Sequence, residues 1–147
     1  KEELFRSVVQ ALIDAIINDA ESVAASSLPV DAKVRGILEA KFTRMYELVF
    51  SSAHAAELLE SSDAQARDIA AAGDRHFRSV LTGVLTDEQS AGHLDLERLG
   101  ATTDDLTDAL MVAGHGASWN ATSATDHQRN IARQVRFLLA GVSRRLS

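Results

Sequence analysis

Five histidines are the side chains of this sequence best suited to proton transfer or metal binding, and their spacing supports neither. They are His54, His76, His93, His115 and His127. None belongs to a metal-binding pattern such as His-Glu-x-x-His, and His115 has no Asp, Glu or His three or four residues after it. The chain has no cysteine, and neither a glycine-rich phosphate loop nor a nucleophile elbow occurs. We therefore expect no catalytic residue, no metal and no cofactor, and we do not expect an enzyme.

A second set of side chains is better suited to binding an apolar ligand. Such a site is mostly apolar, with a few polar groups that converge on the ligand. His115 and Trp119 lie four residues apart beside Met111, and His76 flanks an apolar stripe earlier in the chain. The predicted ligand-binding residues are Phe42, Met45, Tyr46, His76, Met111, His115 and Trp119. The alternative for each of them is ordinary core packing, because Met, Phe and Trp at helical spacing usually belong to a core.

The composition predicts that helices position these side chains. Of the 147 residues 46% are hydrophobic, yet aromatic residues make up only 5% and Pro29 is the single proline. Good helix formers dominate, and β-branched residues form no alternating runs, which favours an all-α fold. A chain of this length can bury a substantial core. We predict one all-α domain over residues 1–147, built as a bundle of six helices.

Capping residues, proline and apolar spacing predict where these helices begin and end. Pro29 separates the first two helices, Asp63 caps the fourth, and Thr102 or Thr103 caps the fifth. A capping box, Thr125-x-x-Gln128, is expected to open the sixth. The predicted helices cover 1–25, 30–50, a short piece over 53–60, 63–92, a fifth from 102 or 103 whose stripe continues to 121, and a sixth from 125 onward.

The last two predicted helices favour self-association. Each carries an apolar stripe, and two such helices from each of two chains form an antiparallel four-helix bundle across a two-fold axis. Gly114 and Gly116 each cost about 1 kcal/mol relative to Ala in a helix interior, so we expect a backbone or a ligand to approach them closely. Periodicity alone equally allows a helical hairpin within one chain. The predicted interface residues are Leu106, Leu110, Ala113, Ala117, Ile131, Val135, Leu138 and Val142.

Charge and hydropathy argue against two classes of partner. The formal net charge is −6, whereas a free-standing nucleic-acid binder usually carries a basic patch. No apolar run reaches the roughly 18 residues that a membrane span needs. We therefore expect no membrane partner and no direct binding of DNA by these residues.

The order of several segments resembles the ligand-binding and dimerising part of tetracycline-repressor-like (TetR family) regulators. The opening Lys1-Glu2-Glu3-Leu4-Phe5 and the long helix after it are similar to the point at which the family's helix-turn-helix ends. Similar segments then follow in the family's order. They are the turn 28–31, the stretch 51–59, residues 77–81 followed by 92–95, and residues 102–110 followed by the late Gly114 and Gly116. The DNA-reading helix-turn-helix is missing, so we expect something to have been removed before Lys1.

The resemblance implies the effector-sensing and dimerisation domain of a cytoplasmic TetR-like transcriptional repressor. Its partners would be a second copy of the chain and a small, mostly apolar effector, and DNA would be bound only through the missing N-terminal domain. The effector would enter among the first, second, fourth and fifth helices and alter DNA binding by favouring one setting of the first helix. The alternative is a helical structural or interaction module that has no ligand.

Overall fold

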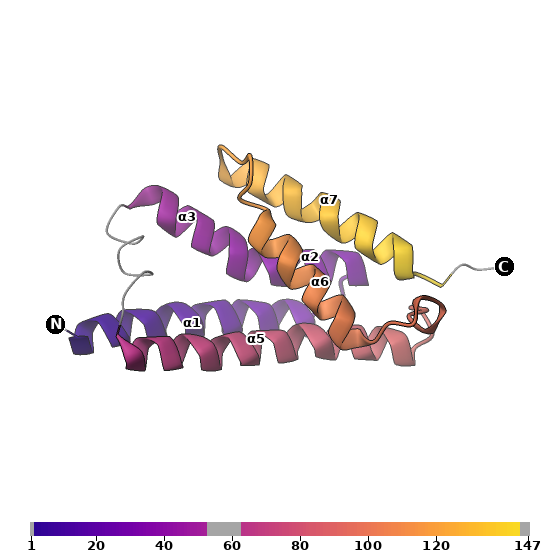
Figure 1. Ribbon diagram of the computed structural model, residues 1–147, viewed down its shortest axis with the longest axis horizontal. Coiled ribbons are helices and arrows are strands. Elements are labelled where there is room, and N and C mark those ends of the chain that lie inside the picture. Colours follow the sequence, from indigo (N-terminus) through magenta and orange to yellow (C-terminus); the bar gives the residue numbers. More distant parts are fainter. Residues whose placement is uncertain (1, 53–62, 145–147) are drawn as a thin grey trace.

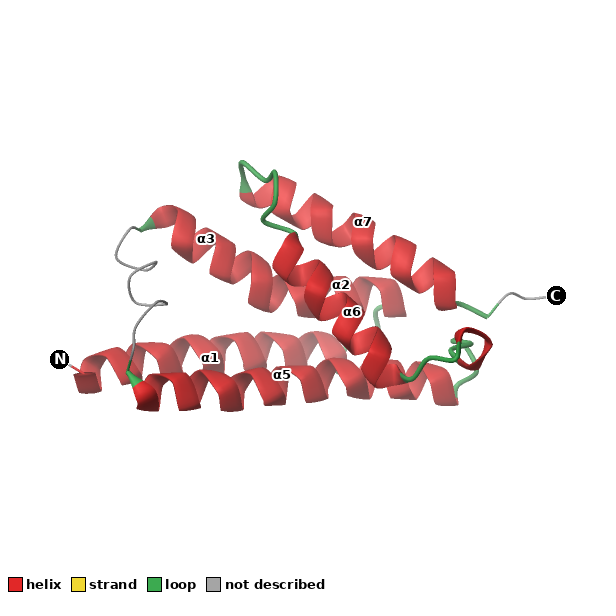
Figure 2. Cartoon of the chain, in the orientation of Figure 1, coloured by secondary structure: helices red, strands yellow, loops and turns green. Residues whose placement is uncertain are grey.

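The structure is a computed structural model that describes residues 2–52 and 63–144. Within these two ranges the chain consists of helices joined by short loops, and no β-strand is present (Figure 2). Backbone pairing of the β type is limited, within these ranges, to one isolated antiparallel bridge between Leu94 and Ser143. The prediction of an all-α fold is therefore confirmed.

Three consecutive segments join into one long helix in the first half of the chain. The helix α2 (Val30–Leu38) continues into a π-helical turn, η1 (Glu39–Thr43), and then into α3 (Arg44–Ser51). The backbone at both junctions stays in the right-handed helical region, so the helix is not interrupted. Pro29 precedes it in an extended conformation, as expected of a residue that cannot continue the preceding helix.

Four further α-helices and one short 3₁₀ turn complete the described chain. When α2, η1 and α3 are counted as one, the described residues form five helices. The short helix predicted over 53–60 lies outside the described residues, so the count of six is not confirmed. The further elements are α1 (Glu2–Ala24), α5 (Ala64–Ser90), the 3₁₀ turn η2 (Glu97–Leu99), α6 (Thr103–Gly116) and α7 (Ala124–Val142).

The helices α1 and α5 lie side by side along most of their length and form one layer of the molecule (Figure 1). Their approach is close, because a Cβ atom at Gly73 would lie 2.5 Å from the Cγ2 atom of Ile13. Arg6 donates hydrogen bonds of 3.1 and 3.2 Å to the two carboxylate oxygens of Asp63, which joins the beginning of α1 to the N-cap of α5. The missing side chain at Gly73 is therefore what allows the two long helices to pack this tightly.

The continuous helix α2–η1–α3 and α7 form the other side of the molecule, and α6 contacts both α5 and α7 (Figure 1). Each of α1, α2, α5, α6 and α7 contributes at least one fully buried side chain to a single hydrophobic core, and η1 contributes the buried Phe42. The core includes Ile16, Ile17, Ala20, Val34, Ile37, Leu38, Phe42, Phe77, Leu81, Leu85, Leu106, Leu110, Met111, Ile131, Val135 and Leu139.

Two of the predicted helix caps are confirmed. The carboxylate of Asp63 accepts a hydrogen bond of 2.9 Å from the backbone N–H of Ala66. At the start of α6, the hydroxyl of Thr102 accepts from the N–H of Asp105, whose carboxylate accepts in turn from the N–H of Thr102. This reciprocal pair is a capping box, so the beginning of α6 is determined locally by two side chains.

The predicted cap of the last helix is wrong. The hydroxyl of Ser123 caps α7 by accepting a hydrogen bond of 3.1 Å from the N–H of Asp126, and Thr125 lies inside the helix. The preceding helix α6 also ends at Gly116, earlier than its apolar stripe suggested. Asn130 holds the turn between these helices, because its side chain donates to the carbonyl oxygen of Ala117 at 2.9 Å.

His127 is a buried polar side chain in the first turn of α7. Only 2% of it is exposed, and its Nδ1 atom lies 2.9 Å from the hydroxyl of Thr43. Its ring stacks on Tyr46, with the centroids 4.8 Å apart. Burial lowers the pKa of His127 below its ordinary value of 6.5, although the charge of Glu47 on α3 acts in the opposite direction. A neutral imidazole is therefore part of the packing between α7 and the long helix.

We expect this burial to make the folded state sensitive to acid. The unfolded chain protonates the imidazole of His127 near pH 6.5, while the folded chain binds that proton only at lower pH. The stability due to neutral His127 is thus present above pH 6.5 and is lost as the pH falls through the lower, folded-state pKa. Urea denaturation between about pH 8 and about pH 5 should show a larger loss of unfolding free energy for the wild type than for His127→Gln. Equal losses in the two proteins would contradict this assignment.

Candidate functional site

Phe42 is the centre of an aromatic cluster where the long helix meets α5 and α6. Its side chain is buried and lies directly on the backbone of α6, because a Cβ atom at Gly114 would be 2.3 Å from two of its ring carbons. The ring of His115 meets it edge to face at a centroid distance of 4.8 Å, and the ring of Phe77 does so at 6.2 Å. We call Phe42, Phe77, Gly114 and His115 the Phe42 junction.

A lysine lies at the edge of this junction. The ammonium group of Lys41 lies 5.4 Å from the ring centroid of Phe42 and 5.2 Å from that of Phe77, within the range of a cation–π contact. The same group forms a salt bridge with Asp74 of α5. The residues that carry these rings and charges belong to η1, α5 and α6, so the π-helical turn is what brings Lys41 and Phe42 to the other two helices. Such turns occur often at functional sites.

The other predicted ligand residues of the long helix and α6 have different surroundings. Tyr46 stacks on His127 and on Phe50, and its hydroxyl donates a hydrogen bond of 3.2 Å to the carbonyl oxygen of Ala121. Met45 packs at the margin of the core, and Met111 is buried within it. These three side chains therefore have packing partners of their own.

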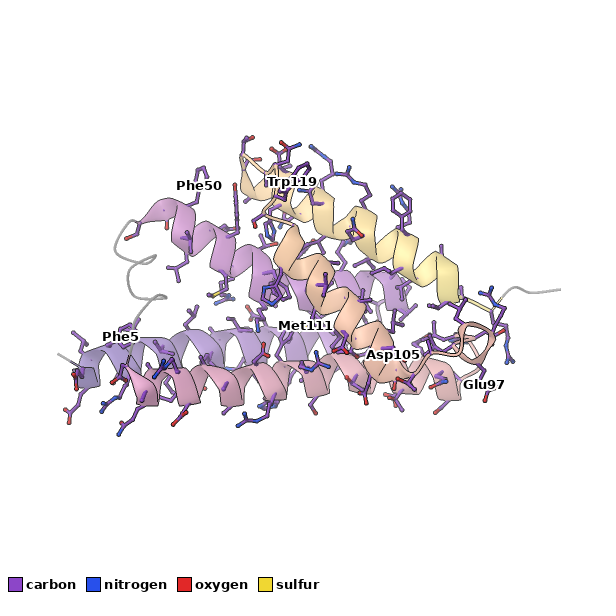
Figure 3. All side chains as sticks on the ribbon, in the orientation of Figure 1. Phe5, Phe50, Glu97, Asp105, Met111 and Trp119 are labelled. Carbon is purple, nitrogen blue, oxygen red and sulfur yellow. The ribbon has the colours of Figure 1, made fainter. Side chains whose placement is uncertain are left out.

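His76 and Trp119 lie in two separate grooves, so the predicted set does not line one shared cavity. The imidazole of His76 lies in a groove between α1 and α5, where its Nε2 atom is 2.8 Å from a carboxylate oxygen of Glu21. Trp119 follows the end of α6 beside α7 (Figure 3). Its side chain is 79% exposed. The expectation of one common cavity is wrong for this conformation. Of the seven predicted residues, the structure joins Phe42 with His115, and the ring of Phe42 fills the space against the backbone of Gly114.

Most of the predicted dimer residues are buried inside their own chain. Leu106, Leu110, Ala117, Ile131, Val135 and Val142 belong to the core, so they are not available to a partner in this structure. Ala113 and Leu138 are partly exposed and line a groove between α6 and α7. The apolar stripes of the sequence thus identified mainly the inner faces of these two helices.

A different set of residues forms the exposed surface of α6 and α7. It contains three large hydrophobic side chains, since Val112 is 70% exposed, Trp119 79% and Phe137 61%. Two glycines, Gly116 and Gly141, lie on the same faces, and a Cβ atom at either would meet no atom within 4 Å. The sequence carries a signal for this surface, because helical spacing places Val112 and Trp119 on the side of α6 away from Leu106 and Leu110. We call Val112, Ala113, Gly116, Trp119, Gln134, Phe137, Leu138 and Gly141 the outer face.

Charged side chains lie at both ends of the outer face. Arg129 and Arg133 line its groove near the beginning of α7. Asp105 and Asp108 lie on α6 toward its beginning, and Figure 3 shows Asp105 at the opposite end of α6 from Trp119. Asp126 is paired locally, because the backbone N–H and the hydroxyl of Thr122 donate hydrogen bonds to its carboxylate. These hydrogen bonds lower the pKa of the Asp126 carboxyl group.

Comparisons of the chain with protein-family models, with curated proteins and with solved structures find no match. Within the part of the chain that the structure describes, none of the helices combines the length and apolar character needed to cross a bilayer. The Phe42 junction and the outer face are the two features of the described residues that suggest a function.

We expect one methyl group added at Gly114 to disturb the packing of the Phe42 junction. Gly114→Ala should destabilise the fold by about 1–3 kcal/mol, because the new Cβ atom would overlap the buried ring of Phe42. Gly83→Ala is the matched control, since Gly83 also lies inside a helix but has open space around it. That change should stabilise the protein by up to about 1 kcal/mol through helix propensity. Denaturation midpoints that move in the same direction for both variants would contradict the close contact.

Proposed function

We propose that this chain is the dimerisation and effector-sensing domain of a TetR-like transcriptional regulator. The observation that carries the proposal is the outer face, where Val112, Trp119 and Phe137 are exposed on the last two helices of the chain. In the resemblance drawn from the sequence, these are the helices that join two subunits. An exposed apolar surface of this kind on a folded domain commonly marks a site of association.

The regulator would bind DNA through an N-terminal domain that leads into α1, and it would act in the cytoplasm as a repressor. Two subunits joined through α6 and α7 hold their α1 helices at a defined separation, and DNA half-sites must match the separation of the two recognition helices. An effector changes DNA binding if its affinity differs between two settings of α1.

The effector would act at the Phe42 junction. Phe42 and His115 are the two predicted ligand residues that lie in contact, and the ring of Phe42 occupies the space between α6 and α5. A small apolar molecule with one or two polar groups would take the place of that ring. The imidazole of His115, which is exposed, would supply a polar contact from the surface side.

A second candidate function is a helical structural or interaction module without a ligand. The observation that favours it is the closed packing at Gly114, which leaves no space beside Phe42 in this conformation. The two functions share the dimer and differ in whether a small molecule binds.

We expect the wild-type chain to sediment as a homodimer at roughly tens of micromolar. Val112→Glu and Phe137→Glu should each weaken the dimer at least about a hundredfold, because each places an unpaired carboxylate in the interface. Leu28→Glu is the control, since Leu28 is an exposed hydrophobic side chain in the turn between α1 and α2. A wild-type chain that is purely monomeric at this concentration would overturn the proposed dimer.

We expect effector binding to raise the melting temperature. A panel of small phenols, aromatic acids and medium-chain alcohols should contain compounds that stabilise the dimer by about 1.4 kcal/mol at ten times their Kd, or roughly 3–6 °C for a domain of this size. His115→Phe should retain the fold and reduce the shift for compounds that bind the imidazole. If no compound in the panel shifts the melting temperature while the dimer persists, the ligand-free module is the better description.

A further inference from the structure

A row of arginines follows one side of α7 and faces a groove between α7 and α2. Arg129, Arg133 and Arg136 recur at four- and three-residue spacing, which places them on one side of the helix. All three line the groove, and Arg35 lines it from α2. The buried side chain of Val135 lies among them. In a chain whose formal net charge is −6, this groove gathers four positive charges.

Two of the four arginines have carboxylate partners in their own helices or next to them. The Nε atom of Arg35 lies 3.8 Å from an oxygen of Glu39, and an Nη atom of Arg129 lies 3.1 Å from an oxygen of Asp126. Both arginine side chains are nevertheless at least half exposed to solvent. A guanidinium group has five N–H donors, so a single carboxylate leaves several of them available to a ligand.

The other two arginines have no carboxylate partner within the part of the chain that the structure describes. Arg133 donates a hydrogen bond of 2.7 Å to the side-chain oxygen of Asn130. The guanidinium group of Arg136 lies 5.7 Å from the ring centroid of Phe137. Like charges three or four residues apart on a helix repel one another. The charges of Arg133 and Arg136 are therefore available to an anion, and a bound anion would relieve their repulsion.

A phosphoryl group suits such a cluster better than a carboxylate does. One arginine binds both oxygens of a carboxylate and neutralises its single charge. A terminal phosphoryl group has three acceptor oxygens and up to two negative charges, so it can accept hydrogen bonds from two arginines at once. Arg133 and Arg136, one helical turn apart, would share one phosphoryl group, and Arg35 and Arg129 would supply donors to a second.

The charge of the whole chain favours a small ligand over a polymer. At physiological salt the field of a charge decays over about 8 Å, so a small anion in the groove interacts chiefly with the arginines that line it. A nucleic acid or an anionic membrane extends well beyond this distance. It would also meet the remaining surface of a chain whose net charge is −6, which repels it.

We propose that the groove between α2 and α7 binds a small molecule with two adjacent phosphoryl groups, held by Arg35, Arg129, Arg133 and Arg136. This site goes beyond the proposed function, because it is separate from the Phe42 junction and needs no second subunit. Asp31, which lies one turn before Arg35 on α2, is the one carboxylate among the described residues that line the groove. Its charge opposes an anionic ligand, which gives the site a test of opposite sign.

The first test removes arginines and measures pyrophosphate binding by isothermal titration calorimetry at constant, low ionic strength. The wild-type chain should bind pyrophosphate with a Kd below about 1 mM. Arg133→Gln and Arg136→Gln should each raise this Kd at least about fivefold, because each removes a charged donor. Arg136→Lys should raise it at least about twofold, since lysine keeps the charge but lacks the planar fork. Arg75→Gln is the matched control, because Arg75 is an exposed arginine on α5, and it should change the Kd less than about 1.5-fold.

The second test removes the opposing carboxylate. Asp31→Asn should lower the Kd for pyrophosphate about threefold, because the amide no longer repels the ligand. Asp68→Asn is the control, since it removes the same charge from an exposed position on α5 and should change the Kd less than about 1.5-fold. This pair separates a local effect in the groove from an effect of net charge. Circular dichroism should report a folded chain for every variant, because each substitution lies at an exposed position.

Pyrophosphate binding that both glutamine variants weaken and Asp31→Asn strengthens supports the site. A folded wild-type chain that binds no pyrophosphate at about 10 mM overturns it. So does binding that Arg75→Gln weakens as much as Arg136→Gln does. Duplex DNA or phosphatidylserine vesicles that bind through Arg133 and Arg136, and that pyrophosphate does not displace, would assign the row to a macromolecule and also overturn the proposal. None of these outcomes depends on whether the chain dimerises, so the proposed function is tested separately.

Discussion

The contact between the Phe42 ring and the backbone of Gly114 sets the rotation of α6 about its own axis. Each residue of an α-helix advances about 100° around the axis, so residues two positions from Gly114 point to the opposite side. Val112 and Gly116 stand at those positions, which is why both lie on the outer face. A side chain larger than hydrogen at 114 would push α6 away from the long helix. The same contact therefore closes the Phe42 junction and directs the outer face to solvent.

The ion pairs around the bundle orient the helices more than they stabilise them. Arg6–Asp63, Lys41–Asp74 and Arg78–Asp108 each link α5 or its cap to another helix, and all three retain access to water. Exposed pairs of this kind contribute about 0–1 kcal/mol each. Burial of aliphatic side chains and the close approach at Gly73 supply the larger share of the stability. The α1–α5 layer is accordingly held mainly by packing. In the proposed regulator, a firmly packed α1 would transmit a small tilt to the DNA-binding domain.

The Phe42 junction and the outer face are connected through a short series of packed residues. Thr43 follows Phe42 in the π-helical turn and contacts the buried His127 of α7. Tyr46, one turn later, stacks on His127 and donates to the carbonyl of Ala121 in the α6–α7 turn. Displacement of Phe42 by a ligand would thus disturb the residues that hold this turn next to Trp119. Effector binding and subunit contact would share these side chains.

The sequence by itself determined the helical class, the break at Pro29, and the caps at Asp63 and Thr102, because each depends on local backbone chemistry. It also marked Gly114 as a place of close approach. It did not determine which side of α6 and α7 faces inward. Both sides of α6 are apolar, and helical periodicity fits either side equally well. The sequence alone therefore predicts Leu110 at the interface and Trp119 in the interior. Only the tertiary contact of Phe42 with Gly114 decides which side of α6 faces inward. The Phe42 ring fits only against a glycine, so α6 must turn Gly114 toward it, and this fixes the rotation of the helix.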